Sequence, residues 1–130
     1  MLRWLPLCAA LLLLVGCSSA SKPMEEILPA TAGSWSRTTT SALDASSAPE
    51  LIRQLGLKRA ASATYTGPAT ATIRLFEMNV QTSAFELIQK WRQKEDGLAV
   101  YSGPYFIVAN PNSPPEASSL LEEVRKQLQQ

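Results

Sequence analysis

"YTGP" at residues 65–68 returns as "YSGP" at residues 101–104, 36 positions later in a chain of 130 residues. The likeness extends upstream, because residues 50–68 and 86–104 align without a gap and share eight identities in 19 positions. The pattern of each copy predicts a helix followed by two strands that meet at the Gly-Pro pair. The sequence therefore predicts an internal αββ repeat of period 36.

Both copies open with a helical pattern. In the first, Ser47 is expected to cap a short helix, and Gly56 is expected to end it in a left-handed conformation. In the second, Ser83 and Glu86 are expected to form a capping box at the start of the helix. The apolar stripe that turns this second helix towards the core is Ala84, Leu87, Ile88 and Trp91.

Each helix leads into a predicted hairpin, over residues 59–80 and 98–110. Proline cannot donate to a strand ladder, so the two Gly-Pro pairs mark the hairpin corners. In the first hairpin, alternation predicts that one set of side chains faces one side of the sheet and a second set faces the other. The first set is Ile73 and Leu75, and the second is Arg74, Phe76 and Met78.

Tyr65 and Tyr101 stand just before the two corners. We expect their rings to pack at the strand ends. The alternative is functional, in which the two corners form a paired binding rim with Tyr65 and Tyr101 as contact residues. The remaining aromatic residues are assigned to the core, and these are Trp35, Phe76, Phe85, Trp91, Tyr105 and Phe106.

Two further elements flank the repeat. Residues 33–44 have the composition of a strand, and Ser113 is expected to cap a C-terminal helix with a second capping box. The apolar stripe of that helix is Ala117, Leu120, Leu121, Val124 and Leu128. The order β, α, β, β, α, β, β, α predicts one α+β domain over residues 33–130, a small ferredoxin-like sandwich with an antiparallel or mixed sheet and helices on one face.

The N-terminal 16 residues have the plan of a secretory signal peptide: Arg3, then an apolar stretch from Leu5 to Val15, then Gly16. The stretch is too short for a permanent membrane helix, which needs roughly 20 apolar residues. Its end, Leu14, Val15, Gly16 and Cys17, resembles the lipobox of bacterial lipoproteins.

That resemblance implies cleavage between Gly16 and Cys17, a diacylglycerol on the Cys17 sulfur and an acyl chain such as palmitate on its freed amine. The membrane is then a partner through these chains. Ser18 and Ser19 after the cysteine imply delivery to the outer membrane where an organism has two. The alternatives are an ordinary cleaved leader with an incidental cysteine, or a cysteine buried in the core.

Residues 17–32 are predicted to be the lipidated cysteine and a flexible tether, because Ser, Ala and Pro are frequent there and no periodicity is sustained. Cys8 leaves with the leader, so the mature chain has no free thiol and no internal disulfide. Residues 55–79 resemble an uncharacterised family of bacterial envelope proteins. This likeness implies an envelope location and no catalytic residues.

The sequence offers little catalytic chemistry. It has no histidine, which removes the commonest general base near neutral pH and the commonest metal ligand. Three acidic pairs, Glu25 with Glu26, Glu95 with Asp96 and Glu122 with Glu123, are expected to lie on solvated faces. No metal or cofactor site is predicted.

Charge also argues against a polyanionic partner. The chain has 12 basic and 11 acidic residues, and loss of Arg3 with the leader makes the mature protein neutral. Nucleic acid is therefore not an expected partner. We expect a non-enzymatic binding or assembly module of the cell envelope, whose partner is an envelope protein or a cell-wall polymer. The alternative is a small hydrolase or hydrolase inhibitor that works through Asp, Glu and Tyr.

Overall fold

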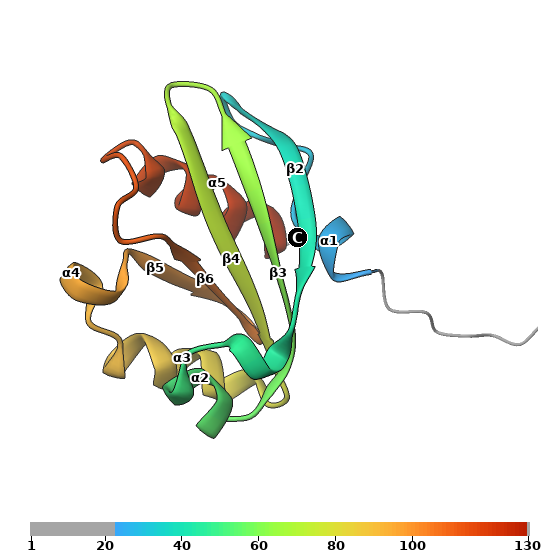
Figure 1. Ribbon diagram of the computed structural model, residues 1–130, viewed down its shortest axis with the longest axis vertical. Helices are drawn as coiled ribbons and strands as arrows, with labels where there is room; N and C mark the ends of the chain where they lie inside the picture. The colour runs from blue at the N-terminus through green and yellow to red at the C-terminus, as the bar shows by residue number, and fades with distance from the viewer. Residues whose placement is uncertain (1–22, 130) are drawn as a thin grey trace, which may run out of the picture.

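Six strands in one antiparallel sheet form the frame of the molecule (Figure 1). The structure is a computed structural model that describes residues 23–129. In chain order its elements are α1 (Met24–Ile27), β1 (Thr31–Ala32), β2 (Trp35–Leu43), the 3-10 helix η1 (Ala45–Ser47), α2 (Glu50–Gln54), β3 (Leu57–Thr66), β4 (Thr70–Met78), α3 (Gln81–Lys90), α4 (Gln93–Asp96), β5 (Ala99–Ser102), β6 (Tyr105–Ala109) and α5 (Ala117–Leu128).

The strand order across the sheet is β1-β2-β3-β4-β6-β5. Every pairing between described strands is antiparallel, so the α+β class and the antiparallel sheet are confirmed. The two predicted hairpins are confirmed as well, since β3 pairs with β4 and β5 pairs with β6. The two edges of the sheet therefore belong to the β1–β2 side and to β5.

The finer prediction of a ferredoxin-like sandwich is not confirmed. That fold joins the two strands of each βαβ unit around a strand inserted between them, whereas here β2 pairs directly with β3 across α2, in a sheet of order β1-β2-β3-β4-β6-β5. The internal repeat is not confirmed either. Both units have the order helix, strand, strand, but β3 and β4 are 10 and 9 residues long whereas β5 and β6 are 4 and 5. The sequence identities do not extend to element lengths.

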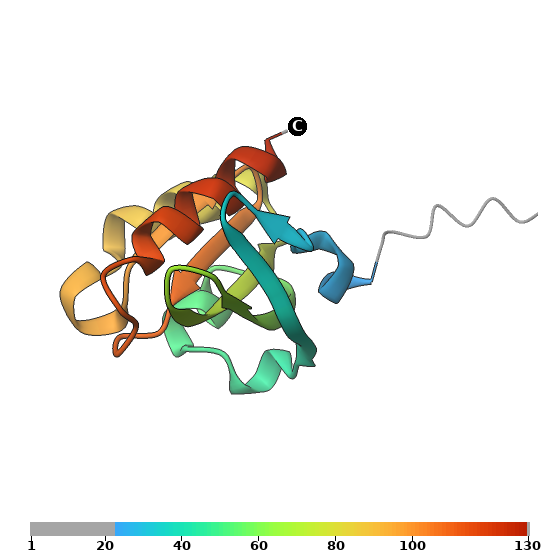
Figure 2. The ribbon, with the colours of Figure 1, turned by 90° about the horizontal axis from the view of Figure 1, so that it is seen from above.

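Apolar side chains fill both faces of the sheet, as the alternation along β4 predicts. Ile73 and Leu75 belong to one buried cluster, and Phe76 and Met78 belong to the other. The first cluster is covered by α5 and α1, and the second is covered by α2 and α3. Figure 2 shows α5 crossing one side of the curled sheet. The prediction that the helices lie on one face is therefore wrong, because two apolar faces each need a cover.

The segment predicted as a tether is partly folded. Met24, Leu28 and Ala32 are buried in the first cluster, where α1 packs beside β2 and β3. Two side chains also bind this segment, since Tyr65 donates a hydrogen bond to the Pro29 carbonyl at 2.6 Å and Arg37 donates one to the Leu28 carbonyl. The domain therefore begins by residue 23 rather than 33, and the predicted tether is wrong over residues 23–32.

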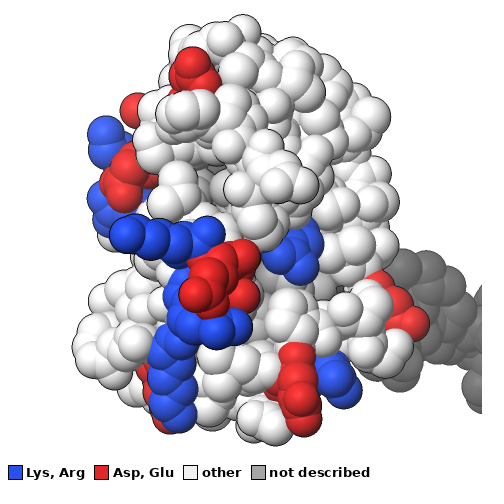
Figure 3. Space-filling model, turned by 60° about the vertical axis from the view of Figure 1, so that its left-hand side comes forward, with Lys and Arg blue, Asp and Glu red and all other residues white. Residues whose placement is uncertain are grey.

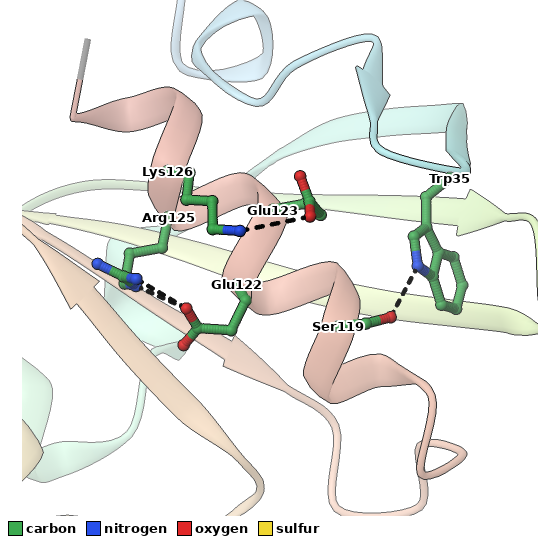
Figure 4. A network of polar contacts seen from close by, with 6 residues as sticks. All are labelled: Trp35, Ser119, Glu122, Glu123, Arg125 and Lys126. Atoms are coloured by element: carbon green, nitrogen blue, oxygen red, sulfur yellow. Dashed lines mark hydrogen bonds and ion pairs between the residues drawn. The ribbon is translucent and has the colours of Figure 1, made fainter.

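The C-terminal helix α5 packs through the predicted stripe. Ala117, Leu120, Leu121 and Val124 are all buried. Its first turn also holds β2, because the buried indole of Trp35 donates a hydrogen bond to the Ser119 hydroxyl at 3.2 Å (Figure 4). This contact joins two elements separated by 84 residues. Strand β2 is thus fixed to the C-terminal helix as well as to its neighbour β3.

Helix starts differ from the predictions. Helix α5 begins at Ala117, with Glu116 at the N-cap and no side-chain capping bond, so the Ser113 cap is wrong. Helix α3 begins at Gln81, and Ser83 is buried inside it rather than capping it. Ser47 belongs to η1 and does not cap α2. The predicted left-handed stop after α2 is confirmed, because Gly56 has a φ of 96°.

Replacing Tyr65 by Phe tests how firmly the N-terminal segment is held. The substitution leaves the Pro29 carbonyl without its buried donor, so we expect the free energy of unfolding to fall by about 1–3 kcal/mol in urea titrations. Tyr101→Phe serves as the control, since that side chain is partly exposed and should change stability by less than about 0.5 kcal/mol. Equal losses in the two variants would contradict a structural role for the Tyr65 hydroxyl.

The parent protein and the Tyr65→Phe variant should also differ in how their stability depends on pH. Burial raises the pKa of Tyr65 to about 12, even though Arg37 nearby acts in the opposite direction. The folded state therefore keeps this proton more tightly than the unfolded chain, whose tyrosines titrate near 10. The resulting stability is complete below pH 10 and is lost as the pH rises towards 12. Tyr65→Phe should lack this component of the alkaline loss.

Candidate binding site

The two Gly-Pro corners lie at opposite ends of the sheet. Tyr65 pairs with Ala71 at the start of β4, whereas the Pro104 carbonyl accepts a hydrogen bond from Met78 N–H at the end of β4. The alternative of a paired binding rim is therefore wrong. Tyr65 is fully buried, which agrees with the packing role, while Tyr101 keeps 36% of its surface exposed. Of the two predicted contact residues, only Tyr101 is accessible.

Tyr101 lies on β5, which is the outermost strand on its side of the sheet. Ala109 N–H donates to the Leu98 carbonyl, so residues 98 and 109 form a hydrogen-bonded pair. Such pairs alternate along an antiparallel ladder. By the register of β5 on β6, Val100 and Ser102 direct their peptide groups at β6, whereas Ala99 and Tyr101 direct theirs away from the sheet.

A side chain occupies the first of these two outward positions. The Gln93 amide accepts a hydrogen bond from Ala99 N–H at 2.8 Å and donates one to the Ala99 carbonyl at 3.4 Å. Gln93 thus binds Ala99 as a neighbouring strand would. The chain between them turns at Gly97, whose φ of 104° and 2.1 Å approach of a would-be Cβ to the Ala109 carbonyl require glycine. The outward peptide groups of Ala99 are therefore already hydrogen-bonded by Gln93, whereas those of Tyr101 are available to another strand.

A groove of about 410 Å³ runs along this edge. Its floor is residues 99–103, and its two walls come from opposite faces of the sheet. Ile88 of α3 forms one wall, and Arg125 and Gln129 at the end of α5 form the other. An occupant of the groove would therefore meet an apolar wall on one side and a polar wall on the other.

Two exposed aromatic side chains lie together beside this edge. The large hydrophobic residues with exposed side chains in the described range are Val80 (55%), Phe85 (47%), Leu98 (40%) and Tyr101 (36%), and all lie between the end of β4 and β5. Phe85 and Tyr101 form an edge-to-face pair with ring centroids 5.7 Å apart. The prediction that Phe85 is a core residue is wrong. Two aromatic rings at the surface beside an open strand edge favour a binding surface.

The groove carries little net charge. The Arg125 guanidinium is bound by Glu122 of the same helix, with N–O distances of 2.7 and 3.0 Å (Figure 4). Glu123 and Lys126 form a second, longer pair on this helix at 3.7 Å. The cation at the rim of the groove is therefore already neutralised. Recognition in the groove depends on peptide groups and aromatic rings more than on charge.

The other edge of the sheet is built differently. Beyond its short pairing with β1, strand β2 is lined by exposed polar residues 38–41 and contains a register shift between Arg37 and Thr39. The Thr38 hydroxyl donates to the Thr64 carbonyl. Bulges and polar side chains are common protections against unwanted strand pairing. Strand β5 is therefore the better candidate for a binding edge.

Two of the acidic pairs named from the sequence are bound to cations and do not form a separate acid and base. Arg92 binds both Glu95 and Asp96, at 2.6 and 3.5 Å, and Glu122 and Glu123 pair with cations on α5. In the part of the chain that the structure describes, no group of three or more His, Cys, Asp or Glu side chains is placed to hold a metal ion. Gly16 and Cys17 lie outside the described residues.

Comparison with known proteins adds no relative: no family model, curated protein or solved structure matches this chain. Within residues 23–129, none of the helices has the length and apolar character needed to cross a bilayer.

Sequence reasoning found Tyr101 for another reason and missed Phe85. The angular position of Phe85 on the helix could have revealed its exposure. Ala84 and Leu87 mark the buried face of α3, which ends at Lys90 before the predicted Trp91, and Phe85 falls about 100° from Ala84 around the helix. A large aromatic side chain off the stripe is an accessible one, and it sits where a helix faces the edge strand.

Amide hydrogen exchange tests how the β5 edge is closed. We expect the Ala99 amide to be protected by Gln93 and the Tyr101 amide to exchange rapidly, with Val100 protected by β6. Gln93→Ala should raise the Ala99 rate to that of Tyr101 and lower the free energy of unfolding by about 1 kcal/mol. Gln93→Glu is the matched control, since its carboxylate still accepts from Ala99 N–H. A protected Tyr101 amide in the free protein would contradict the assigned register.

Proposed function

We propose that this protein is a lipid-anchored module of the bacterial cell envelope that binds an extended segment of another envelope protein as an added strand on β5. The observation that carries the proposal is Tyr101. Its peptide N–H and C=O point away from the sheet, and its exposed ring pairs with Phe85 beside them. Strand addition uses main-chain hydrogen bonds for affinity and alternate side-chain pockets for specificity.

The groove also defines the segment that fits. Side chains of an added strand point alternately to the two faces of the sheet. One set would lie against Ile88 and the Phe85–Tyr101 pair, and the other would lie against Arg125 and Gln129. The expected partner segment therefore alternates apolar and polar residues. A cell-wall polymer lacks such a strand and is the less favoured partner.

The anchor is proposed from the resemblance of residues 14–17 to a lipobox. With residues 23–32 folded, the tether shortens to residues 17–22, which as a flexible segment would span about 12–15 Å. The domain would then be held close to the bilayer. Helix α1 lies beside β2 at one side of the molecule and β5 lies at the other (Figure 1). Because the sheet curls, the end of α5 reaches both sides: Gln127 donates a hydrogen bond to the Thr31 carbonyl of β1, and Gln129 lines the groove at β5.

We propose no catalytic activity. The alternative of a small hydrolase or hydrolase inhibitor that uses Asp, Glu and Tyr finds less support, because Glu95 and Asp96 share one cation. Tyr105 is also a poor proton donor or acceptor near neutral pH, since partial burial and the neighbouring Glu77 raise its pKa above the usual value.

The anchor predicts the mass of the protein in its natural membrane. We expect a chain that starts at Cys17 and carries a diacylglycerol and an N-acyl chain, found in the membrane fraction. Cys17→Ala should abolish the added mass and release the protein from that fraction. The exposed Ser46→Ala is a control that should change neither result. Full-length, unmodified protein that is freely soluble inside cells would refute the anchor.

Strand addition is tested by separating the Tyr101 ring from its peptide N–H. A photoreactive residue at Gln129 should capture an envelope protein through a segment of alternating polarity, identified by peptide mapping. Tyr101→Ala removes the ring and should weaken capture by about tenfold or less, since an aromatic pair contributes about 0.5–1.5 kcal/mol. Tyr101→Pro also removes the outward N–H and should abolish capture.

The proline is expected to be tolerated by the fold, because this N–H makes no bond to β6. A photoreactive residue at Thr38, on the opposite edge, is the positional control and should capture nothing specific. Equal capture by Tyr101→Pro and Tyr101→Ala, with both variants folded, would rule out strand addition.

A further inference from the structure

A second cavity, of about 390 Å³, lies on the face of the sheet covered by α2 and α3. Arg74 of β4 lines it from the sheet, and Pro49 and Leu51 line it from the α2 side. The remaining wall comes from residues 90–96, where α3 passes into α4, and from Pro111. The cavity shares no lining residue with the groove at β5, so it is a separate site.

Arg74 has an unusual position in this cavity. Its Nε is buried and has no hydrogen-bond partner within residues 23–129. The guanidinium carbon lies 5.5 Å from the centre of the Phe76 ring, and burial lowers the pKa of the side chain, although arginine stays charged in proteins. A buried donor without a partner is costly to fold. The cation–π contact with Phe76 offsets part of that cost.

The other cations around the cavity are already paired. Arg92 binds Glu95 and Asp96, and Lys90 binds Glu86 at 3.1 Å. Arg74 makes no salt bridge with any residue of the described range. Its neighbours across the sheet are Ser62 and Val108, neither of which is acidic. The cavity therefore contains one positive charge that its own walls do not compensate.

The walls also restrict the kind of anion that fits. Figure 3 shows acidic side chains among the basic ones on the face that includes α4, so no broad positive field is present. Glu95 and Asp96 at the cavity would repel a doubly charged phosphate more strongly than a singly charged carboxylate. Pro49, Leu51 and Pro111 offer apolar contact for the body of a ligand. The volume is within the range of small-molecule sites.

We propose that this cavity is a binding site for a small organic carboxylate, whose two oxygens pair end-on with the two Nη groups of Arg74 while its apolar body contacts Pro49 and Leu51. Such a bidentate pair would compensate the positive charge that the cavity walls leave unpaired, and a charge-assisted pair is roughly twice as strong as a neutral one. The site goes beyond strand capture at β5 and does not depend on it.

The test follows the Arg74 Nε–H resonance by NMR in the purified protein. N-acetylleucine supplies one carboxylate and an apolar body, and N-acetylleucine amide is the matched ligand without the charge. We expect the acid to shift the Arg74 resonance in a saturable manner and the amide to leave it unchanged. Phosphate should bind more weakly than the acid. No saturable shift with the acid, equal shifts with the amide, or tighter binding of phosphate would overturn the proposal.

Variants provide a second measurement. Arg74→Gln should weaken binding of N-acetylleucine about ten- to hundredfold, and Arg74→Lys, which keeps the charge but not the paired donors, should also weaken it. Lys126→Gln removes an exposed cation of α5 that lines neither the cavity nor the groove and should bind as the parent does. Each variant is checked for folding by thermal unfolding, and the Nε–H titration of the parent protein decides the matter even where a variant fails to fold. Unchanged affinity in a folded Arg74→Gln would overturn the proposal.

Discussion

Burial of β4 on both of its faces is the constraint on which the rest of the structure depends. Ile73 and Leu75 need a cover on one side, and Phe76 and Met78 need one on the other. Helix α5 and the folded N-terminal segment supply the first cover, while α2 and α3 supply the second. Because both faces of the central strands are covered, the peptide groups and side chains of the sheet are accessible mainly at its two edges. The accessible features of the molecule accordingly lie at β5 and at the margin of the α2–α3 cover, where Arg74 is left without a partner.

The sequence predicted what depends on local pattern. The sequence correctly predicts the strand alternation in β4, the Gly-Pro corners and the apolar stripe of α5, because each is a periodicity or a backbone restriction within a few residues. Contacts between residues far apart in the sequence cannot be predicted from such local patterns. Met24 and Leu28 make a short pattern between prolines that resembles a linker, and only packing beside β2 and β3, where Tyr65 binds the Pro29 carbonyl, explains their burial. Ser83 has the right spacing for a cap, but the helix starts earlier and buries it.

The candidate site illustrates the same limit. Tyr101 stood out because its tetrapeptide recurs, yet its accessibility follows from the strand order, which places β5 at an edge and Tyr65 in the interior. Arg74 was assigned correctly to the face of Phe76 and Met78. The absence of an ion-pair partner for Arg74 could not be predicted, since it depends on which cations form ion pairs with the acidic residues near α4. Arg92 is closer in sequence to Glu95 and Asp96 and takes both.

The two edges differ in a way that bears on how strongly β5 could bind. Gln93 leaves one residue of β5, Tyr101, with both peptide groups free, so an added strand would gain few main-chain hydrogen bonds. Each contributes only about 0.5–1.5 kcal/mol, and the Phe85–Tyr101 pair adds a comparable amount. A partner free in solution would therefore be held weakly. Two proteins held at one membrane are confined to the same thin layer, which raises the local concentration of each for the other above that in free solution. A short, partly closed edge would thus suit the proposed anchored protein, because it would bind a neighbour at the same membrane while pairing poorly with free strands.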